Sequence, residues 1–274
     1  MSPKVTSTKT KAVRKDSAIS GRFYDVDGEL YPSVTHILGA IAKPALIPWA
    51  AAQERTLVTD AAADLYVEWL REVVPPQMPR AAYVATLLAR LGQVKAHQKE
   101  LAKAGEIGTQ THKLIEWTMR TAIGADAGPK PLVNEKALWG FMAFEDWAKS
   151  VALKPVLIEQ TVYSKTHQYA GTMDLLARVN GVLTLVDFKT GKAIYPEAHL
   201  QSVAYQAALI EMGYVAPSAG LIVRLPKVDT DPAFEVGTVP PVAELFPVFQ
   251  AVQALWKWSY AQDAAYRARR EAVA

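Results

Sequence analysis

The chain has 274 residues and no cysteine. Disulfide bonds, thiol catalysis and cysteine-ligated zinc or iron–sulfur clusters are therefore excluded, and a cytoplasmic location is expected. No apolar run reaches the about 18–20 residues that a membrane-spanning helix needs, and we find no secretory signal pattern. A GxxxxGK[ST] segment is also missing, so no fused ATP-driven motor is expected.

The chain also lacks a strong charge of either sign. Its formal net charge is +3, but residues 1–20 hold five basic side chains against one acidic one, so the other 254 residues carry a net charge of −1. We therefore expect no uniformly basic surface, and any contact with nucleic acid must come from local patches. Residues 1–20 are rich in Ser, Thr and Lys, which predicts a disordered basic tail.

Half of the residues are apolar, and their periodicity changes along the chain. A small hairpin within residues 22–31 and a short helix capped by Ser33 are followed by patterns typical of helices, at 44–55, 59–74, 80–103, 106–121 (with a break near Gly105) and 134–150. After Pro155 the predicted elements are strands at 156–163, 169–179 and 182–189, a helix at 197–212, strands at 219–225 and 234–239, and a helix at 241–268. We expect a mainly helical region at 21–154, a core at 155–274 and an α+β or mixed α/β fold.

The dipeptide Asn180-Gly181 lies between two apolar runs and predicts a hairpin with a type I′ turn. In a two-residue loop, Asp174 would lie opposite Asp187, and Thr172 opposite Lys189. Directly opposed residues lie on the same face of the sheet, and their Cβ atoms are about 4.5–5.5 Å apart. The two carboxylates would therefore repel each other. A positive charge is expected between them, either Lys189 or, as the better candidate, a divalent cation. The alternative, a simple Asp–Lys salt bridge, leaves the second aspartate uncompensated.

The strand at 182–189 is apolar on both faces, which indicates a central position in the sheet. Asp174, Asp187 and the Phe188 carbonyl would form a site of hard oxygen ligands suited to Mg²⁺ or Mn²⁺. Beside such a cation, Lys189 could orient or deprotonate a water, or stabilise charge on a phosphate.

Two further pairs lie four residues apart on predicted helices. Gln201 and Tyr205 would project from one helix face, where they could contact a base or a phosphate or be ordinary amphipathic positions. His112 and Glu116 form the second pair, and no second histidine completes an HExxH zinc pattern.

Together these segments resemble the PD-(D/E)xK nuclease superfamily, and within it the RecB-type branch. The matching segments are His112 within GTQTHKLIE, Gly171-Thr172-Met173-Asp174, Asp187-Phe188-Lys189-Thr190-Gly191 and Gln201-x-x-x-Tyr205. Their order and spacing agree over roughly residues 105–210. Met173 replaces the proline of the superfamily name and Asp187 replaces its glutamate, both of which are common in this branch. Several relatives in the branch carry an iron–sulfur cluster, which this chain cannot hold.

The resemblance implies a restriction-endonuclease-like core, a central mixed sheet flanked by helices, with a helical N-terminal region that could form a cap or arch. It implies Mg²⁺- or Mn²⁺-dependent cleavage of DNA, with single-stranded DNA and exonuclease action as the expectation. Asp174, Asp187 and Lys189 would be catalytic, and His112, both aspartates and the Phe188 carbonyl would bind metal. The alternatives are a structure- or sequence-specific endonuclease, and a DNA-binding recombination or repair protein without activity.

Weaker candidates surround this set. Further DNA contacts are expected from Gln201, Tyr205, Thr190, Lys192, Ser33, Thr35 and Arg224. Glu116 and Glu159 are possible additional acids. The segment Pro32-Ser33-Val34-Thr35 resembles an opening motif of phage and mitochondrial exonucleases. The alanine-rich, cysteine-free composition is compatible with a bacterial or phage source, so the cytoplasm of a bacterial or phage-infected cell is the expected setting. Recombination or replication proteins are candidate partners.

Overall fold

The structure is a computed structural model, and it describes residues 13–17, 21–71, 79–92, 95–228, 230–231 and 233–271. Most of the predicted tail, residues 1–12 and 18–20, lies outside the described residues, whereas 13–17 form a strand. Two compact units are present. The first, here the sheet unit, consists of the chain up to Ile41 and from Ile107 onward; the second, the helical unit, is Ala42–Glu106.

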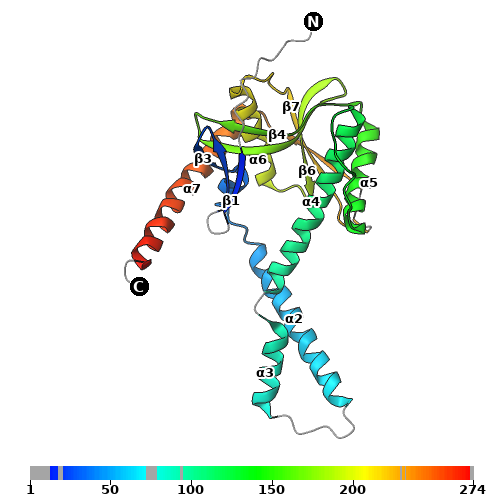
Figure 1. Cartoon of the computed structure of the whole chain (residues 1–274), viewed down its shortest axis with the longest axis vertical. Coiled ribbons are helices and arrows are strands. Elements are labelled where there is room, and N and C mark those ends of the chain that lie inside the picture. Colours follow the sequence, from blue (N-terminus) through cyan, green and yellow to red (C-terminus); the bar gives the residue numbers. More distant parts are fainter. Residues whose placement is uncertain are drawn as a thin grey trace. The chain divides into compact units, whose positions relative to one another are not determined.

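The sheet unit contains two sheets and several helices (Figure 1). A three-stranded sheet is formed in the order β1 (Val13–Ser17), β2 (Gly21–Val26) and β3 (Glu29–Pro32). A five-stranded sheet has the order β4 (Leu153–Ser164), β5 (Tyr169–Val179), β6 (Val182–Thr190), β7 (Ala219–Leu225) and β8 (Glu235–Val239). The helices are α1 (Val34–Leu38), the later part of α4 (Ala96–Ala122), α5 (Glu135–Ser150), α6 (Pro196–Glu211) and α7 (Val242–Glu271).

The predicted hairpin is confirmed. Asn180 and Gly181 both have positive φ, 50° and 88°, as a type I′ turn requires. Strands β5 and β6 pair in the predicted register from Val179↔Val182 to Leu175↔Val186. Strand β6 then pairs in parallel with β7, and α6 lies between these two strands in the chain. The five-stranded sheet is therefore mixed, as expected.

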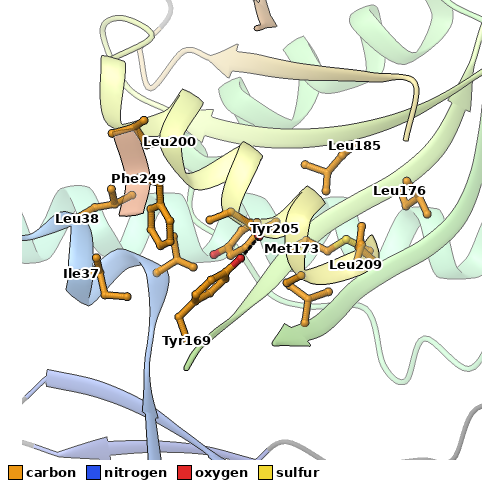
Figure 2. Packing of buried hydrophobic residues seen from close by; sticks show 14 of the residues in the cluster. Ile37, Leu38, Tyr169, Met173, Leu176, Leu185, Leu200, Tyr205, Leu209 and Phe249 are labelled. Atoms are coloured by element: carbon orange, nitrogen blue, oxygen red, sulfur yellow. Dashed lines mark hydrogen bonds between the residues drawn. The ribbon is translucent and has the colours of Figure 1, made fainter. Parts of the chain in front are cut away.

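Helices cover both faces of the five-stranded sheet. On one face α6, α1 and α7 enclose a core that Figure 2 shows around Met173 and Leu185. On the other face α4 and α5, which lie side by side in Figure 1, pack Ile115 and Trp147 against Phe188. Strand β6 is the middle strand of the five, and because both faces of the sheet are covered, its Asp187 is buried. Packing thus joins α4 and α5 to the strands, whereas the sequence pattern assigned them to the region before residue 155.

The helical unit differs from the sequence-based expectation in its helix boundaries. A single helix, α2 (Leu46–Leu70), replaces the two predicted helices, since the Thr59 hydroxyl bonds back to the Arg55 and Thr56 carbonyls and stays within the helix. Helix α3 (Arg80–Leu91) ends before Gly92, whose φ is 66°. The predicted break near Gly105 was wrong, because α4 passes through it; an isolated helical glycine costs only about 1 kcal/mol.

Within the part of the chain that the structure describes, we find no helix with the combination of length and apolar character that a bilayer span requires.

A close helix contact in the sheet unit gives a test of this packing. A Cβ added at Gly140 would lie 3.0 Å from the Thr111 methyl group and 3.1 Å from the Pro226 carbonyl oxygen. Gly140→Ala is therefore expected to lower the free energy of unfolding by about 1–3 kcal/mol, through overpacking. Gly105→Ala, where a Cβ meets nothing within 4 Å, is the control and should stabilise by up to about 1 kcal/mol. Urea unfolding measures both, and equal effects of the two substitutions would contradict the packing.

Candidate metal centre

The hydrogen-bonded ladder between β5 and β6 stops one residue before the two aspartates. Its last pair is Leu175↔Val186, so the predicted ladder pairs of Asp174 with Asp187 and of Thr172 with Lys189 are not formed. Instead, the Asp174 carboxylate accepts a hydrogen bond of 2.7 Å from the Phe188 amide of β6. The Asp174 side chain thus accepts the hydrogen bond that a backbone carbonyl would accept in a regular ladder. This bond fixes the Asp174 carboxylate beside β6.

The alternation of side chains breaks at the same place. Tyr169 and Met173 of β5 belong to the core under α6, but Leu175 and Ala177, two and four residues further on, belong to the core under α4 and α5. On the adjacent β4, Glu159 has a φ of 49°, a left-handed conformation that is rare for a non-glycine residue in a strand. Such local irregularities change the direction in which side chains leave a strand, and they are typical of functional sites.

The re-aimed acids meet a histidine from α4. His112, Glu159 and Asp174 each offer a ligand atom, and these atoms lie within 4.8 Å of one another. His112 Nδ1 is 3.4 Å from Asp174 Oδ1, and the ring meets Phe188 edge-on with centroids 6.4 Å apart. This group differs from the predicted ligand set because it includes Glu159 and does not include Asp187.

Burial and mutual charge set the protonation of these groups. Burial, followed by the Asp174 charge, raises the pKa of Glu159 to about 8. Burial also acts to raise the pKa of Asp174, but His112 and Lys189 outweigh it and keep this pKa below its usual range. For His112, burial acts to lower the pKa, and Asp174 outweighs it, so the pKa is raised. Without metal, Glu159 is therefore the acid that carries a proton near neutral pH.

Asp187 and Lys189 form the second part of the site. Asp187 is 1% exposed, and its Oδ2 lies 2.5 Å from Lys189 Nζ. Among the described residues, this oxygen has no partner with hydrogen-bond geometry. Burial, together with the Asp174 charge, raises the pKa of Asp187 to about 6, although Lys189 acts in the opposite direction.

These residues fit a divalent cation. The cluster offers carboxylate oxygens and one imidazole nitrogen, a donor set that Mg²⁺ or Mn²⁺ can accept. The buried Asp187 carboxylate is ion-paired with Lys189 through Oδ2, and it adds a further negative charge close to Asp174. A cation would also relieve the repulsion between the acids. The Phe188 carbonyl as a ligand stays a prediction.

Two residues predicted to contact DNA are buried. Tyr205 is 3% exposed, and its ring occupies the space above Gly171, where a Cβ would lie 2.5 Å from Tyr205 Cε1. Its hydroxyl accepts a hydrogen bond of 2.9 Å from Gln201 Nε2. Ser33 is 2% exposed and caps α1 by accepting from the His36 amide. Their burial leaves Tyr205 and Ser33 no surface for a base, so the structure favours positioning roles for both.

Arg224 is also buried and bonds to other residues of the protein. It is 3% exposed and forms ion pairs with Asp231 (2.9 Å) and Glu235 (3.1 Å). It donates further hydrogen bonds to the carbonyl oxygens of Gly191 and Ala233. The prediction of a direct DNA contact is therefore not supported, because Arg224 instead ties the loop after β6 to the loop before β8.

The remaining candidates are divided between surface and interior. Lys192 and Thr35 are exposed and stay candidates for DNA contact. Thr190 lies at the end of β6 beside α4, and a Cβ on Gly108 would come within 2.7 Å of its hydroxyl. Glu116 accepts a hydrogen bond of 2.8 Å from Arg120 on α4. Apart from its place in the His112 motif, no pattern in the sequence marked Gly108 as a contact point.

A mixed sheet between helices carries acids, a histidine and a lysine where two of its strands separate, an arrangement that suits a metal-dependent hydrolase. The chain belongs to the PD-(D/E)XK nuclease superfamily, whose family model matches residues 79–272. Members of this superfamily are nucleases that use divalent metals.

Other comparisons add little. No curated protein matches the chain. A solved structure titled "Crystal structure of SSO0001" is 15% identical, with a TM-score of 0.25. That match covers 42% of this chain and 56% of the other, so no conclusion about activity follows from it.

The raised pKa of Glu159 predicts a pH-dependent effect on stability. Between pH 4.5 and about 8 the unfolded chain loses this proton while the folded chain retains it, so the group increasingly opposes folding as pH rises. Glu159→Gln should therefore raise the melting temperature of the metal-free protein by roughly 5 °C more at pH 9 than at pH 5. Asp146→Asn, at an exposed position of α5, is the control. A difference that does not grow with pH would contradict the raised pKa.

Arg224 provides a second test, of structure against DNA contact. Removing the Arg224 guanidinium leaves the Gly191 and Ala233 carbonyl oxygens without its hydrogen bonds, and an unsatisfied buried polar group costs about 1–3 kcal/mol. Arg224→Met should therefore lower the free energy of unfolding by a few kcal/mol, measured by urea denaturation. Lys192→Met, the exposed control, should leave stability unchanged. If Arg224→Met weakened DNA binding while stability stayed normal, the assignment to structure would be wrong.

Proposed function

We propose that the protein is a metal-dependent deoxyribonuclease that removes nucleotides from the ends of single-stranded DNA. The observation that carries the nuclease assignment is the cluster of His112, Glu159 and Asp174 beside the Asp187–Lys189 pair, in a chain of this superfamily. DNA as the substrate, single strands and action at ends are supported by the resemblance of the GTQTHKLIE, GTMD, DFKTG and QxxxY segments to the RecB-type branch.

The reaction would be hydrolysis of a phosphodiester. An oxygen of water forms a bond to phosphorus, the bond from phosphorus to the leaving oxygen breaks, and the proton of the water is transferred to the leaving group through solvent or Lys189. When bound, a divalent cation supplies Lewis-acid chemistry, since it neutralises charge on the phosphate and makes water more acidic.

The residues of this chain have separate tasks in that reaction. His112, Asp174 and Asp187, with Glu159 as a further acid, would hold the cation. Lys189, whose Nζ lies 2.5 Å from Asp187 Oδ2, is placed to donate hydrogen bonds that orient the attacking water or stabilise charge on a phosphate oxygen. The pKa of Lys189 is raised, since Asp187 and then Asp174 outweigh the effect of burial, so the residue is cationic at the start of the reaction.

A time course on end-labelled oligonucleotides tests the proposal. Single- and double-stranded DNA, linear and circular, and matching RNA would be incubated with Mg²⁺, Mn²⁺ or EDTA. We expect linear single-stranded DNA to be shortened from an end with either metal and to stay intact in EDTA. Cleavage of circular single strands would indicate an endonuclease instead, and binding without cleavage would favour an inactive DNA-binding protein.

Substitution of Asp187 connects this activity to the site. Asp187→Asn keeps the size of the side chain but removes its charge, so the cleavage rate should fall by at least about 100-fold. DNA binding in EDTA should change little. Asp146→Asn again serves as the control and should retain full activity. A fully active Asp187→Asn variant would remove this residue from the mechanism.

A further inference from the structure

The N-terminal half of β5 runs beyond its last ladder pair with β6. Residues 169–173 pair with β4 on one edge, from Gln160↔Met173 to Ser164↔Tyr169. Among the described residues, β6 forms no ladder pair with this segment on the other edge. A strand edge without a ladder needs other partners for its polar groups and is otherwise free to move.

Contacts from four different elements replace that ladder. Along the segment the partners are Ser33 for Ala170, the Tyr205 ring for Gly171, the Tyr24 hydroxyl for Thr172 and the Phe188 amide for Asp174. Each contact fixes one residue on the way to the Asp174 carboxylate. The contact of Tyr24 is notable because it comes from the β2–β3 hairpin, which lies outside the residues that the family model matches.

The Tyr24 side chain is buried and closely packed. It is 3% exposed and packs with Val26, Tyr31 and Ala170. Its hydroxyl lies 3.1 Å from Thr172 Oγ1. Phe23, the preceding residue, packs edge-on against His36 with ring centroids 5.3 Å apart, which anchors the hairpin to α1.

We propose that Tyr24 is a positioning residue of the metal centre, which acts through Thr172 to hold the Asp174 carboxylate against the Phe188 amide and His112. Thr172 lies two residues before Asp174 on β5, so a shift of Thr172 is transmitted along the strand to Asp174. The hairpin is then part of the nuclease site and not an appendage. The inference rests on the proposed metal-dependent nuclease function.

Tyr24→Phe tests the inference, because it keeps the buried ring and removes only the hydroxyl. We expect the dissociation constant for Mn²⁺, measured by calorimetry, to rise about 10-fold, as for other residues that orient metal ligands. In the metal-free protein, hydrogen exchange of the Phe188 amide should become faster. At saturating Mn²⁺ the KM for DNA should be unchanged. Thr172→Val should reproduce these effects, and the double variant should be no worse than either single variant.

Tyr31→Phe is a matched control, since Tyr31 belongs to the same cluster but its hydroxyl donates to Glu29 at 3.2 Å. If Tyr24→Phe behaves like Tyr31→Phe in Mn²⁺ affinity and in Phe188 exchange, the inference is wrong. The proposed function fails separately, when the wild-type protein binds Mn²⁺ but cleaves no DNA. The exchange measurement needs neither metal nor activity and decides the role of Tyr24 in either case.

Discussion

The hydrogen bond from the Phe188 amide to the Asp174 carboxylate is the interaction on which the site depends. It lies where β5 and β6 stop pairing, so a functional side chain takes the place of a backbone carbonyl. A carboxylate held in this way has little freedom to rotate and has one oxygen facing His112. The separation of the two strands therefore fixes the Asp174 carboxylate, a proposed metal ligand, beside β6.

The charges of the site explain why a metal belongs there. Three acids, Glu159, Asp174 and Asp187, are balanced by Lys189 and His112, and in the absence of metal Glu159 retains a proton up to a pKa of about 8. A divalent cation would replace that proton, so metal binding and proton release would be coupled. Crowding these charged groups lowers the free energy of unfolding of the metal-free protein. Binding of a divalent cation to the folded state would raise that free energy again.

Much of this arrangement follows from short-range rules. The Asn180-Gly181 turn, the register as far as Leu175↔Val186 and the helical placement of His112 were all predictable, because turn geometry and periodicity are local. The role of Arg224 was not, since its partners Asp231 and Glu235 depend on how the chain after β7 turns back to pair as β8. Helix boundaries near Gly92 and Gly105 were also misjudged, because a single glycine shifts helix stability by only about 1 kcal/mol.

The sequence by itself determined the strand that carries Asp187 and Lys189, the turn that brings Asp174 to it, and a superfamily with metal-dependent chemistry. Only the tertiary structure decided that the ladder ends before the two aspartates, that Glu159 adopts a positive φ and joins His112, and that Tyr24 reaches Thr172. The physical reason is the range of the interactions. Turns and periodicity act over a few residues, whereas the partners at the end of the ladder come from segments 14 residues (Phe188 and Asp174) to 148 residues (Tyr24 and Thr172) apart.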